Sequence, residues 1–137
     1  MYLSNKHFDR LLEQAGEDKK NFDRCERLSS KAMIYSTGMK IFIFYVNTLA
    51  FKKDINGVIT LNTNGWYTST TKKWINYGLT LTGDKYHIIQ KNFEWYINKR
   101  GTDKIAYDLI NYKDGIILNT TLRSYVEGQV KSGRFDG

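Results

Sequence analysis

The Asn56-Gly57 dipeptide constrains the fold of this chain more than any other pair of neighbouring residues. Both central positions of a type I′ turn need positive φ, which Asn and Gly adopt most readily, so the dipeptide predicts a β-hairpin. The preceding residues, 40–51, are rich in β-branched and aromatic side chains at both odd and even positions. This pattern is typical of one central strand covered on both faces, or of two strands joined by a bend near Asn47. We therefore expect hairpin structure over about 41–62.

Apolar residues recur at helical spacing in the N-terminal part of the chain. Ser4 can cap a first helix, and Gly16 suits the left-handed residue that ends one. Acidic residues at 17–18 then favour the start of a second helix. Its apolar residues, Cys25 among them, keep roughly helical spacing as far as Ala32, so Cys25 is expected to be a small buried hydrophobe.

A run of four hydroxyl residues, 68–71, stands in the middle of the chain. Hydroxyl side chains compete for backbone donors and gather at helix starts. The run therefore predicts a third helix over about 70–81. At helical spacing, Trp74, Gly78 and Leu81 are expected along one face of it.

Two further hairpins are expected after this helix. Alternating apolar residues predict the first at about 86–98, with its turn at Lys91-Asn92 and Phe93 already in the second strand. Another pair of short apolar runs predicts the second at about 105–119. Both predictions rest on strand periodicity and on turn residues between the runs.

These patterns together predict a single α+β domain over residues 1–137. The helical N-terminal part is expected at 1–32, the sheet-containing core at 39–119 and a flexible tail at 128–137. A chain of 137 residues is long enough to bury a core without disulfides or metals.

Positive charge is concentrated in the middle of the chain. Residues 1–31 hold seven Lys and Arg against six Asp and Glu, residues 32–100 hold nine against three, and residues 101–137 hold five against five. The basic middle also contains all three tryptophans. This segment is therefore the place to look for a polyanion or an acidic protein surface as partner.

The inventory of catalytic residues is poor. His7 and His87 are about eighty residues apart with no further ligand at metal spacing, and the single cysteine excludes an intrachain disulfide. The sequence has no phosphate-binding glycine loop. We therefore expect no enzymatic activity, no metal and no cofactor. An enzyme with an unfamiliar site would need Asp84, His87 and Glu94 to converge.

The basic middle supplies candidate contacts instead. Lys72 and Lys73 fall in the first turn of the expected third helix, beside free backbone N–H groups and hydroxyls that favour phosphate contact. An aromatic side chain between cations can stack on an unpaired base. We interpret Trp74 and Trp95 as core residues. The candidate nucleic-acid or partner-binding residues are Lys52, Lys53, Tyr67, Lys72, Lys73, Lys91, Tyr96, Lys99 and Arg100.

The segment Gly65-Trp-Tyr-Thr-Ser-Thr-Thr-Lys72, the following Ile75-Asn76 and the later Trp95-Tyr96 resemble a group of small bacteriophage proteins. Those proteins share a Gly-Trp-x-Thr-x-Thr-Thr-Lys core, and the resemblance covers roughly residues 41–98. It implies no particular activity. Small basic phage proteins without an active site commonly serve as nucleic-acid-binding accessories or as inhibitors of host defences, including anti-CRISPR proteins.

The sequence thus favours a phage-encoded, non-enzymatic binding protein that engages nucleic acid or a host nucleoprotein complex. Its favoured use is inhibition of host defence of the anti-CRISPR type. The positive charge argues against a DNA mimic, and an acidic protein surface is a second kind of partner. The alternative is a phage structural or assembly protein that contacts only other proteins. We expect it in the host cytoplasm with no membrane span, and the sequence leaves room for a homo-oligomer.

Overall fold

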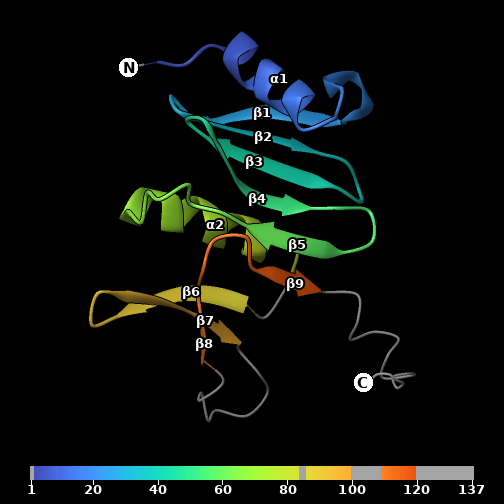
Figure 1. Cartoon of the computed structure of the whole chain (residues 1–137). Helices are drawn as coiled ribbons and strands as arrows, with labels where there is room; N and C mark the ends of the chain where they lie inside the picture. Colours follow the sequence, from blue (N-terminus) through green and yellow to red (C-terminus); the bar gives the residue numbers. More distant parts are fainter. Residues whose placement is uncertain (1, 84–85, 100–108, 120–137) are drawn as a thin grey trace.

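Helices and sheets alternate in successive layers in the computed structural model, which describes residues 2–83, 86–99 and 109–119. Helix α1 (Asn5–Gln14) covers one face of a six-stranded sheet, and helix α2 (Ser69–Leu81) covers the other face. A three-stranded sheet lies against the opposite side of α2 (Figure 1). Helix α2 is therefore enclosed between two sheets.

The six-stranded sheet is antiparallel throughout, in the order β1-β2-β3-β4-β5-β9. A short 3₁₀ helix, η1 (Lys19–Asn21), precedes it. Its strands are β1 (Arg24–Ser29), β2 (Ala32–Ser36), β3 (Ile41–Tyr45), β4 (Thr48–Lys53), β5 (Val58–Leu61) and β9 (Ile117–Asn119). The three-stranded sheet is β6 (Tyr86–Lys91), β7 (Glu94–Lys99) and β8 (Leu109–Asn111).

Two hydrophobic cores, one on each face of the six-stranded sheet, explain why β2, β3 and β4 carry apolar side chains at both odd and even positions. Phe42 and Phe44 belong to the cluster under α1, together with Phe8 and Leu12. Ile43, on the opposite face of β3, belongs to the cluster that contains α2 and the three-stranded sheet. The run from 40 is therefore covered on both faces, and it consists of two strands joined by a turn at Val46-Asn47.

Helix α2 contacts the six-stranded sheet through an unusually close approach at Gly78. A Cβ placed on Gly78 would lie 2.4 Å from Cγ of Phe51 on β4. Trp74, Ile75 and Leu79 fill the space beside this contact and are buried. Leu81 is 41% exposed, so the expected face of Trp74, Gly78 and Leu81 is buried only in its first two members.

Asn76 fixes the three-stranded sheet to the other side of α2. Its side-chain amide donates to the carbonyl oxygen of Ile88 (3.1 Å) and accepts from the N–H of Ile88 (2.7 Å). Ile88 lies on β6, a strand paired only with β7 among the described strands. The amide therefore satisfies backbone groups that the outer edge of β6 would otherwise present unpaired.

The expected second helix is wrong, and with it the α+β class with two N-terminal helices. Residues 24–36 form the β1-β2 hairpin, and the structure is mostly β with one helix before the strands. Positions 22, 28 and 32 share the parity of one strand face as well as helical spacing, and position 25 alone is not enough to separate the two periods over so short a stretch. Their charged neighbours lie on β1, where exposed charged side chains are typical of a strand at the edge of a sheet. Cys25 is accordingly exposed rather than buried.

The expected hairpin at 105–119 is also wrong. Strand β8 pairs with β7, whereas β9 pairs with β5, so the two strands belong to different sheets. The segment between them bridges the two sheets. Its Tyr112 N–H donates to Trp95 of β7, and its Gly115 N–H donates to Leu61 of β5.

Other local expectations agree with the structure in position. Strands β4 and β5 are paired as expected, and α2 begins at Ser69, one residue before the expected start. The turn between β4 and β5 is not type I′, because Gly57 has φ +82° but Asn56 is not among the residues with positive φ, and the Asp54 N–H donates to Val58 around a three-residue loop. In the hairpin at 86–98, Lys91 pairs with Glu94, so the turn is Asn92-Phe93 and Phe93 lies outside the strand. The tail at 128–137 lies outside the described residues.

No helix in the described part of the chain is long and apolar enough to cross a membrane.

Candidate functional site

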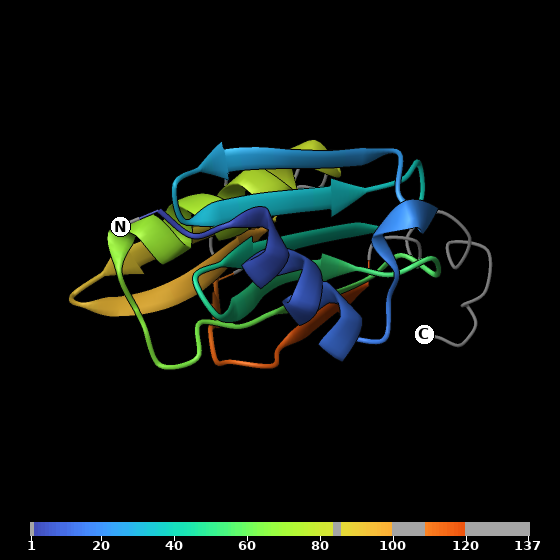
Figure 2. The same ribbon diagram turned by 90° about the horizontal axis from the view of Figure 1, so that it is seen from above.

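Several turns meet at one end of the molecule, where the candidate site lies. The β3–β4 turn, the loop 62–68, the start of α2 and the β6–β7 turn all lie at this end, as does the N-terminus of the chain (Figures 1 and 2). We call residues 45–48, 62–73 and 90–94 the aromatic end. The opposite end holds the β2–β3 and β4–β5 turns and η1.

A carboxylate holds the loop 62–68 in place. Asp114 accepts from the Thr63 N–H (2.8 Å), the Thr63 hydroxyl (2.9 Å) and the Tyr112 hydroxyl (2.7 Å). The Gly65 N–H lies 3.1 Å from the Thr63 hydroxyl and 3.4 Å from Asp114. Gly65 has φ +84°, a conformation that its lack of Cβ permits. This network fixes the loop backbone directly before Trp66, and with it the position of that residue.

The same network shifts two ionisable groups. Partial removal from water would raise the pKa of Asp114, but the hydrogen bonds from Tyr112, Thr63 and Gly65 outweigh that effect and hold the pKa below its usual value. Burial, followed by the hydrogen bond to Asp114, raises the pKa of Tyr112. Asp114 is therefore charged and Tyr112 neutral at physiological pH.

The start of α2 uses two of its four hydroxyls for its own structure. The Thr68 side chain accepts from the Thr71 N–H (3.2 Å), and the hydroxyls of these two residues are 3.1 Å apart. Thr71 is buried, whereas Ser69 and Thr70 stay exposed. Thr68 thus caps the helix with Thr71 as its partner, and Ser69 and Thr70 keep hydroxyls that the cap does not use.

Several aromatic side chains at the aromatic end are exposed to solvent. Trp66 is 64% exposed and Phe93, at the tip of the β6–β7 turn, is 94% exposed. Tyr67 is 49% exposed and packs edge-on against Trp95 and Tyr112, with ring centroids at 4.9 and 5.8 Å. Large apolar side chains held in water in this way mark interaction sites when they gather on one face.

Backbone conformations at the aromatic end are also uncommon. Val46, Asn64, Asn92 and Phe93 have φ between +52° and +67° and are the described non-glycine residues with positive φ. A β-branched residue such as Val46 and a bulky one such as Phe93 are outliers there. Strained residues of this kind cluster at functional sites, where surrounding structure holds them.

Two hollows flank the loop 62–68. One is a pocket of about 280 Å³, lined by Tyr45, Val46, Asn47, Thr48, Asn64, Trp66 and Thr68. The other is a more open groove of about 410 Å³, lined by Tyr67, Gln90, Phe93, Glu94, Trp95, Asn111 and Tyr112. Each hollow thus has one of the two most exposed aromatic side chains of the aromatic end in its wall.

Three of the candidate cations lie at this end without a carboxylate within ion-pair distance among the described residues. Lys72 reaches Gln90 (3.5 Å), Lys73 lies 4.7 Å from the ring of Trp74, and Lys91 begins the β6–β7 turn. The ion pairs found in the described part of the chain all involve residues 9–40. Positive charge at the aromatic end is therefore available to an anionic partner.

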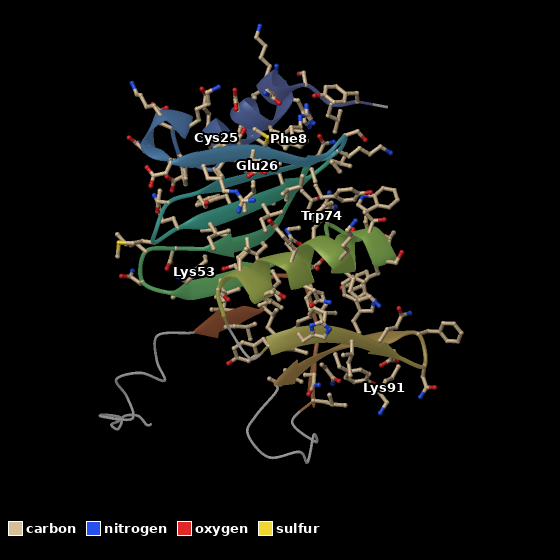
Figure 3. All side chains as sticks on the ribbon, turned by 180° about the vertical axis from the view of Figure 1, so that it is seen from behind. Phe8, Cys25, Glu26, Lys53, Trp74 and Lys91 are labelled. Carbon is tan, nitrogen blue, oxygen red and sulfur yellow. The ribbon has the colours of Figure 1, made fainter. Side chains whose placement is uncertain are left out.

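The remaining candidates are dispersed. Lys52 and Lys53 lie on β4, and Figure 3 places Lys53 and Lys91 at opposite ends of the molecule. Lys99 ends β7, paired with Tyr86 at the far end of the hairpin from Lys91. Arg100 lies outside the described residues.

Tyr96 is also separated from the aromatic end's exposed residues. It alternates with the buried Trp95 and Ile97, so it lies on the face of the three-stranded sheet turned away from α2. Its hydroxyl donates to Glu94 (3.3 Å). The structure thus brings together Tyr67, Lys72, Lys73 and Lys91, and leaves Tyr96 on a neighbouring face.

Sequence reasoning missed Trp66 and Phe93, the most exposed aromatic residues of the site. Trp66 directly follows Asn64-Gly65, a turn signal that could have indicated a loop position. Phe93 carried no such signal. It alternates with Trp95 as residues of a strand do, so the sequence placed it in the second strand of the hairpin and not in the turn. Trp74 and Trp95 are buried, as interpreted.

Two of the residues considered for catalysis lie at different positions of the β6–β7 hairpin, since His87 pairs with Asn98 and Glu94 pairs with Lys91. Nowhere in residues 2–83, 86–99 and 109–119 do three His, Cys, Asp or Glu side chains gather as a metal site would require. His7 Nε2 donates to the carbonyl oxygen of Val46 (2.9 Å), a structural contact that ties α1 to the β3–β4 turn. Asp84, one member of the alternative catalytic set, lies outside the described residues.

Comparison with known proteins identifies a phage family. The family profile of the Kyanoviridae Gp96 protein matches residues 12–119. No curated protein and no solved structure matches the chain. The match extends on both sides of the segment 41–98 that carries the sequence resemblance, and the expectation of a phage protein is confirmed. Whether the Gly-Trp-x-Thr-x-Thr-Thr-Lys core is a hallmark of this family stays a prediction. The chain belongs to the Kyanoviridae Gp96 family.

Proposed function

We propose that this member of the Kyanoviridae Gp96 phage family acts by binding rather than by catalysis, and that its aromatic end engages single-stranded nucleic acid, free or within a host nucleoprotein complex. The observation that carries the proposal is that Lys72, Lys73 and Lys91 lie at the same end of the molecule as the exposed rings of Trp66 and Tyr67 (Figure 1). Cations that lack carboxylate partners can neutralise a phosphate backbone, and exposed rings can stack on bases.

The exposed rings favour a single strand over a duplex. In a duplex the bases are stacked and their faces are covered, so an aromatic side chain gains little from them. An unpaired base offers its π-face to any ring, and stacking on an aromatic side chain contributes about 1–3 kcal/mol per base. Ser69 and Thr70 add exposed hydroxyls that can donate to phosphate oxygens.

Inhibition of host defence in the host cytoplasm is the use we favour for this binding. A phage protein need only bind and obstruct to block a defence complex, which requires no catalytic group. A basic protein would contact the guide RNA or the target DNA of such a complex, or an acidic protein face. Purification of the tagged protein from infected host cells should recover a nucleoprotein whose recovery falls after nuclease treatment.

The direct test is titration of single-stranded DNA and RNA oligonucleotides at several salt concentrations. Reversing both Lys72 and Lys73 to Glu should lower affinity at least about tenfold and flatten the salt dependence, since each phosphate contact contributes a slope of about 0.7 for single strands. The matched control, Lys20→Glu with Lys53→Glu, removes the same charge at the opposite end and should have a smaller effect. Equal effects of the two double variants would contradict a localised binding surface.

One observation favours a second function, assembly through protein contacts alone. Phe93 is almost fully exposed at a hairpin tip in a conformation unusual for a bulky residue. An exposed aromatic ring of this kind suits insertion into an apolar pocket of a protein partner, where such residues often dominate binding energy. This function predicts virion association or stable oligomers, and no salt-sensitive affinity for nucleic acid.

A further inference from the structure

The pocket between the β3–β4 turn and Trp66 has the features of a site for one planar heteroaromatic ring. Seven residues line it, from two separate segments: Tyr45 to Thr48 on one side, and Asn64, Trp66 and Thr68 on the other. Its volume of about 280 Å³ is slightly below the roughly 300–1,000 Å³ of sites for drug-sized ligands. Such a pocket suits a single ring system and is small for a whole nucleotide cofactor.

Trp66 supplies a free aromatic face. The other two tryptophans are buried and each packs against a tyrosine: Trp74 against Tyr77 and Trp95 against Tyr67. Within the described residues, Trp66 has no ring partner and stays 64% exposed while lining the pocket. An indole in this setting is available for stacking by a ligand.

The polar groups of the lining are neutral amides and hydroxyls. No charged side chain is among the seven lining residues, so the pocket does not suit a phosphate or a carboxylate. Asn47 and Asn64 both contribute to the wall, and an Asn side chain offers donor and acceptor together. The base edge of a nucleotide presents the same combination of donors and acceptors.

The walls are held in position from outside the pocket. Val46 occupies the first central position of a two-residue hairpin turn with φ +56°, where Gly is the usual residue. Its N–H donates to Lys31 (2.9 Å), and its carbonyl oxygen accepts from His7 (2.9 Å). On the other wall, Asp114 and Thr63 fix the loop that carries Trp66. Binding would therefore require little ordering of the backbone.

We infer that this pocket takes one unpaired nucleobase of a bound single strand, stacked on Trp66, with the phosphates left outside near Lys72 and Lys73. The inference rests on the proposed function and adds the site and the chemical group recognised. Thr68 connects the two regions, because it lines the pocket and caps the helix turn that carries Lys72.

The test compares a short single-stranded oligonucleotide with the same oligonucleotide made abasic at every position. Wild-type protein should bind the base-containing strand at least about tenfold more tightly, as expected for a stacked base. Trp66→Ala should remove most of this preference while keeping the salt dependence of the wild type. Met39→Ala, which removes an exposed apolar side chain at the opposite end, should leave the preference unchanged.

Fluorescence provides a second measurement, because Trp66 is the exposed tryptophan and iodide should quench it selectively. The bound oligonucleotide should protect it. An unchanged preference for bases in Trp66→Ala, with salt-dependent binding intact, would overturn the pocket and leave the proposed function standing. If no oligonucleotide binds at all, the proposed function fails. Adenosine and uridine are then titrated alone: quenching that Trp66→Ala abolishes would support a base site, and its absence would overturn the pocket too.

Discussion

Gly78 lies where helix α2 comes closest to the six-stranded sheet. In the middle of a helix, replacing Gly by Ala ordinarily stabilises a protein by about 0.5–1 kcal/mol. Here the new Cβ would lie 2.4 Å from the ring of Phe51, a distance that real Cβ atoms do not show. Neither the helix backbone nor a fully buried ring can yield easily. The free-energy cost of this clash should therefore exceed the stabilisation gained from the higher helix propensity of Ala.

We expect Gly78→Ala to destabilise the protein by about 1–3 kcal/mol, measured as the free energy of unfolding in urea. Gly38→Ala is the matched control, because a Cβ at Gly38 meets nothing within 4 Å and its φ is not positive. It should change stability by less than about 0.5 kcal/mol. A stabilised Gly78→Ala variant would show that α2 lies farther from β4.

Asp114 makes the stability of the aromatic end sensitive to acid. Its pKa is lower in the folded state, so its contribution to stability is complete above the unfolded value of about 3.9 and is lost as the pH falls through the folded pKa. Asp114→Asn should cost about 1–2 kcal/mol at pH 7, after allowance for the solvent exposure of the side chain.

The difference in the free energy of unfolding between wild type and Asp114→Asn should narrow as the pH is lowered below about 4, since the wild-type carboxyl is then protonated in the unfolded state before it is protonated in the folded state. Urea unfolding at pH 7 and pH 3 measures it. Asp23→Asn, an exposed substitution on the chain before β1, is the matched control. A stability difference that stays constant between these two pH values would contradict a charged Asp114 at the centre of the network.

At the scale of elements, the attachment of the three-stranded sheet to α2 combines apolar packing with one polar side chain. Ile88, Trp95 and Ile97 supply the packing. Asn76 adds two hydrogen bonds to the backbone of Ile88, in the manner of a neighbouring strand. It also gives a structural reason for the Ile75-Asn76 pair that carries part of the phage resemblance: one residue packs into the core, and the other fixes β6.

Asn76→Ala should destabilise the protein by about 1–3 kcal/mol, because the N–H and the carbonyl of Ile88 lose their partner. Amide hydrogen exchange should show the Ile88 N–H among the groups whose protection falls most. Thr80→Ala, on an exposed position of the same helix, is the control. Unchanged exchange at Ile88 in the Asn76 variant would mean that packing alone holds the sheet.

Sequence patterns predicted the elements whose signals are local. The Asn56-Gly57 turn and helix α2 each carry their own turn or cap residues, and the structure has them at or within one residue of the expected positions. The residues of β1 include no turn or cap residue of this kind. Because this edge strand is short and charged, the spacing of its few apolar residues is compatible with a helix. The pairing of β8 and β9 with different sheets depends on contacts between residues far apart in the chain, which periodicity cannot show.

The candidate site was predictable in part for the same reason. Lys72 and Lys73 were placed correctly at the start of a helix, and Tyr67 lies beside them. Lys53 and Lys99 were grouped with them by charge alone, although the strands carry these residues away from the aromatic end. Trp66 and Phe93 could not be separated from core aromatics, since exposure depends on how loops and turns are held.

At the scale of the whole molecule, ionic interactions and exposed rings are distributed unequally. The ion pairs of the described residues lie within 9–40, around α1, η1 and the first strands. The exposed rings of Trp66, Tyr67 and Phe93 and the strained turn residues lie at the aromatic end. Lys72, Lys73 and Lys91 lie there too, although other cations without carboxylate partners among the described residues, such as Lys52 and Lys53, lie elsewhere. This asymmetry favours one end-on binding surface over a charge spread across the protein.

The most direct measurement is an NMR titration of ¹⁵N-labelled protein with a single-stranded oligonucleotide of about ten nucleotides, a length within the range that small binding domains cover. The account predicts that amide shifts change mainly at residues 45–48, 64–73 and 90–94, with little change in η1 and β1. Shifts that map to η1, β1 or the β4–β5 turn, or a spectrum that does not change at any salt concentration, would contradict it.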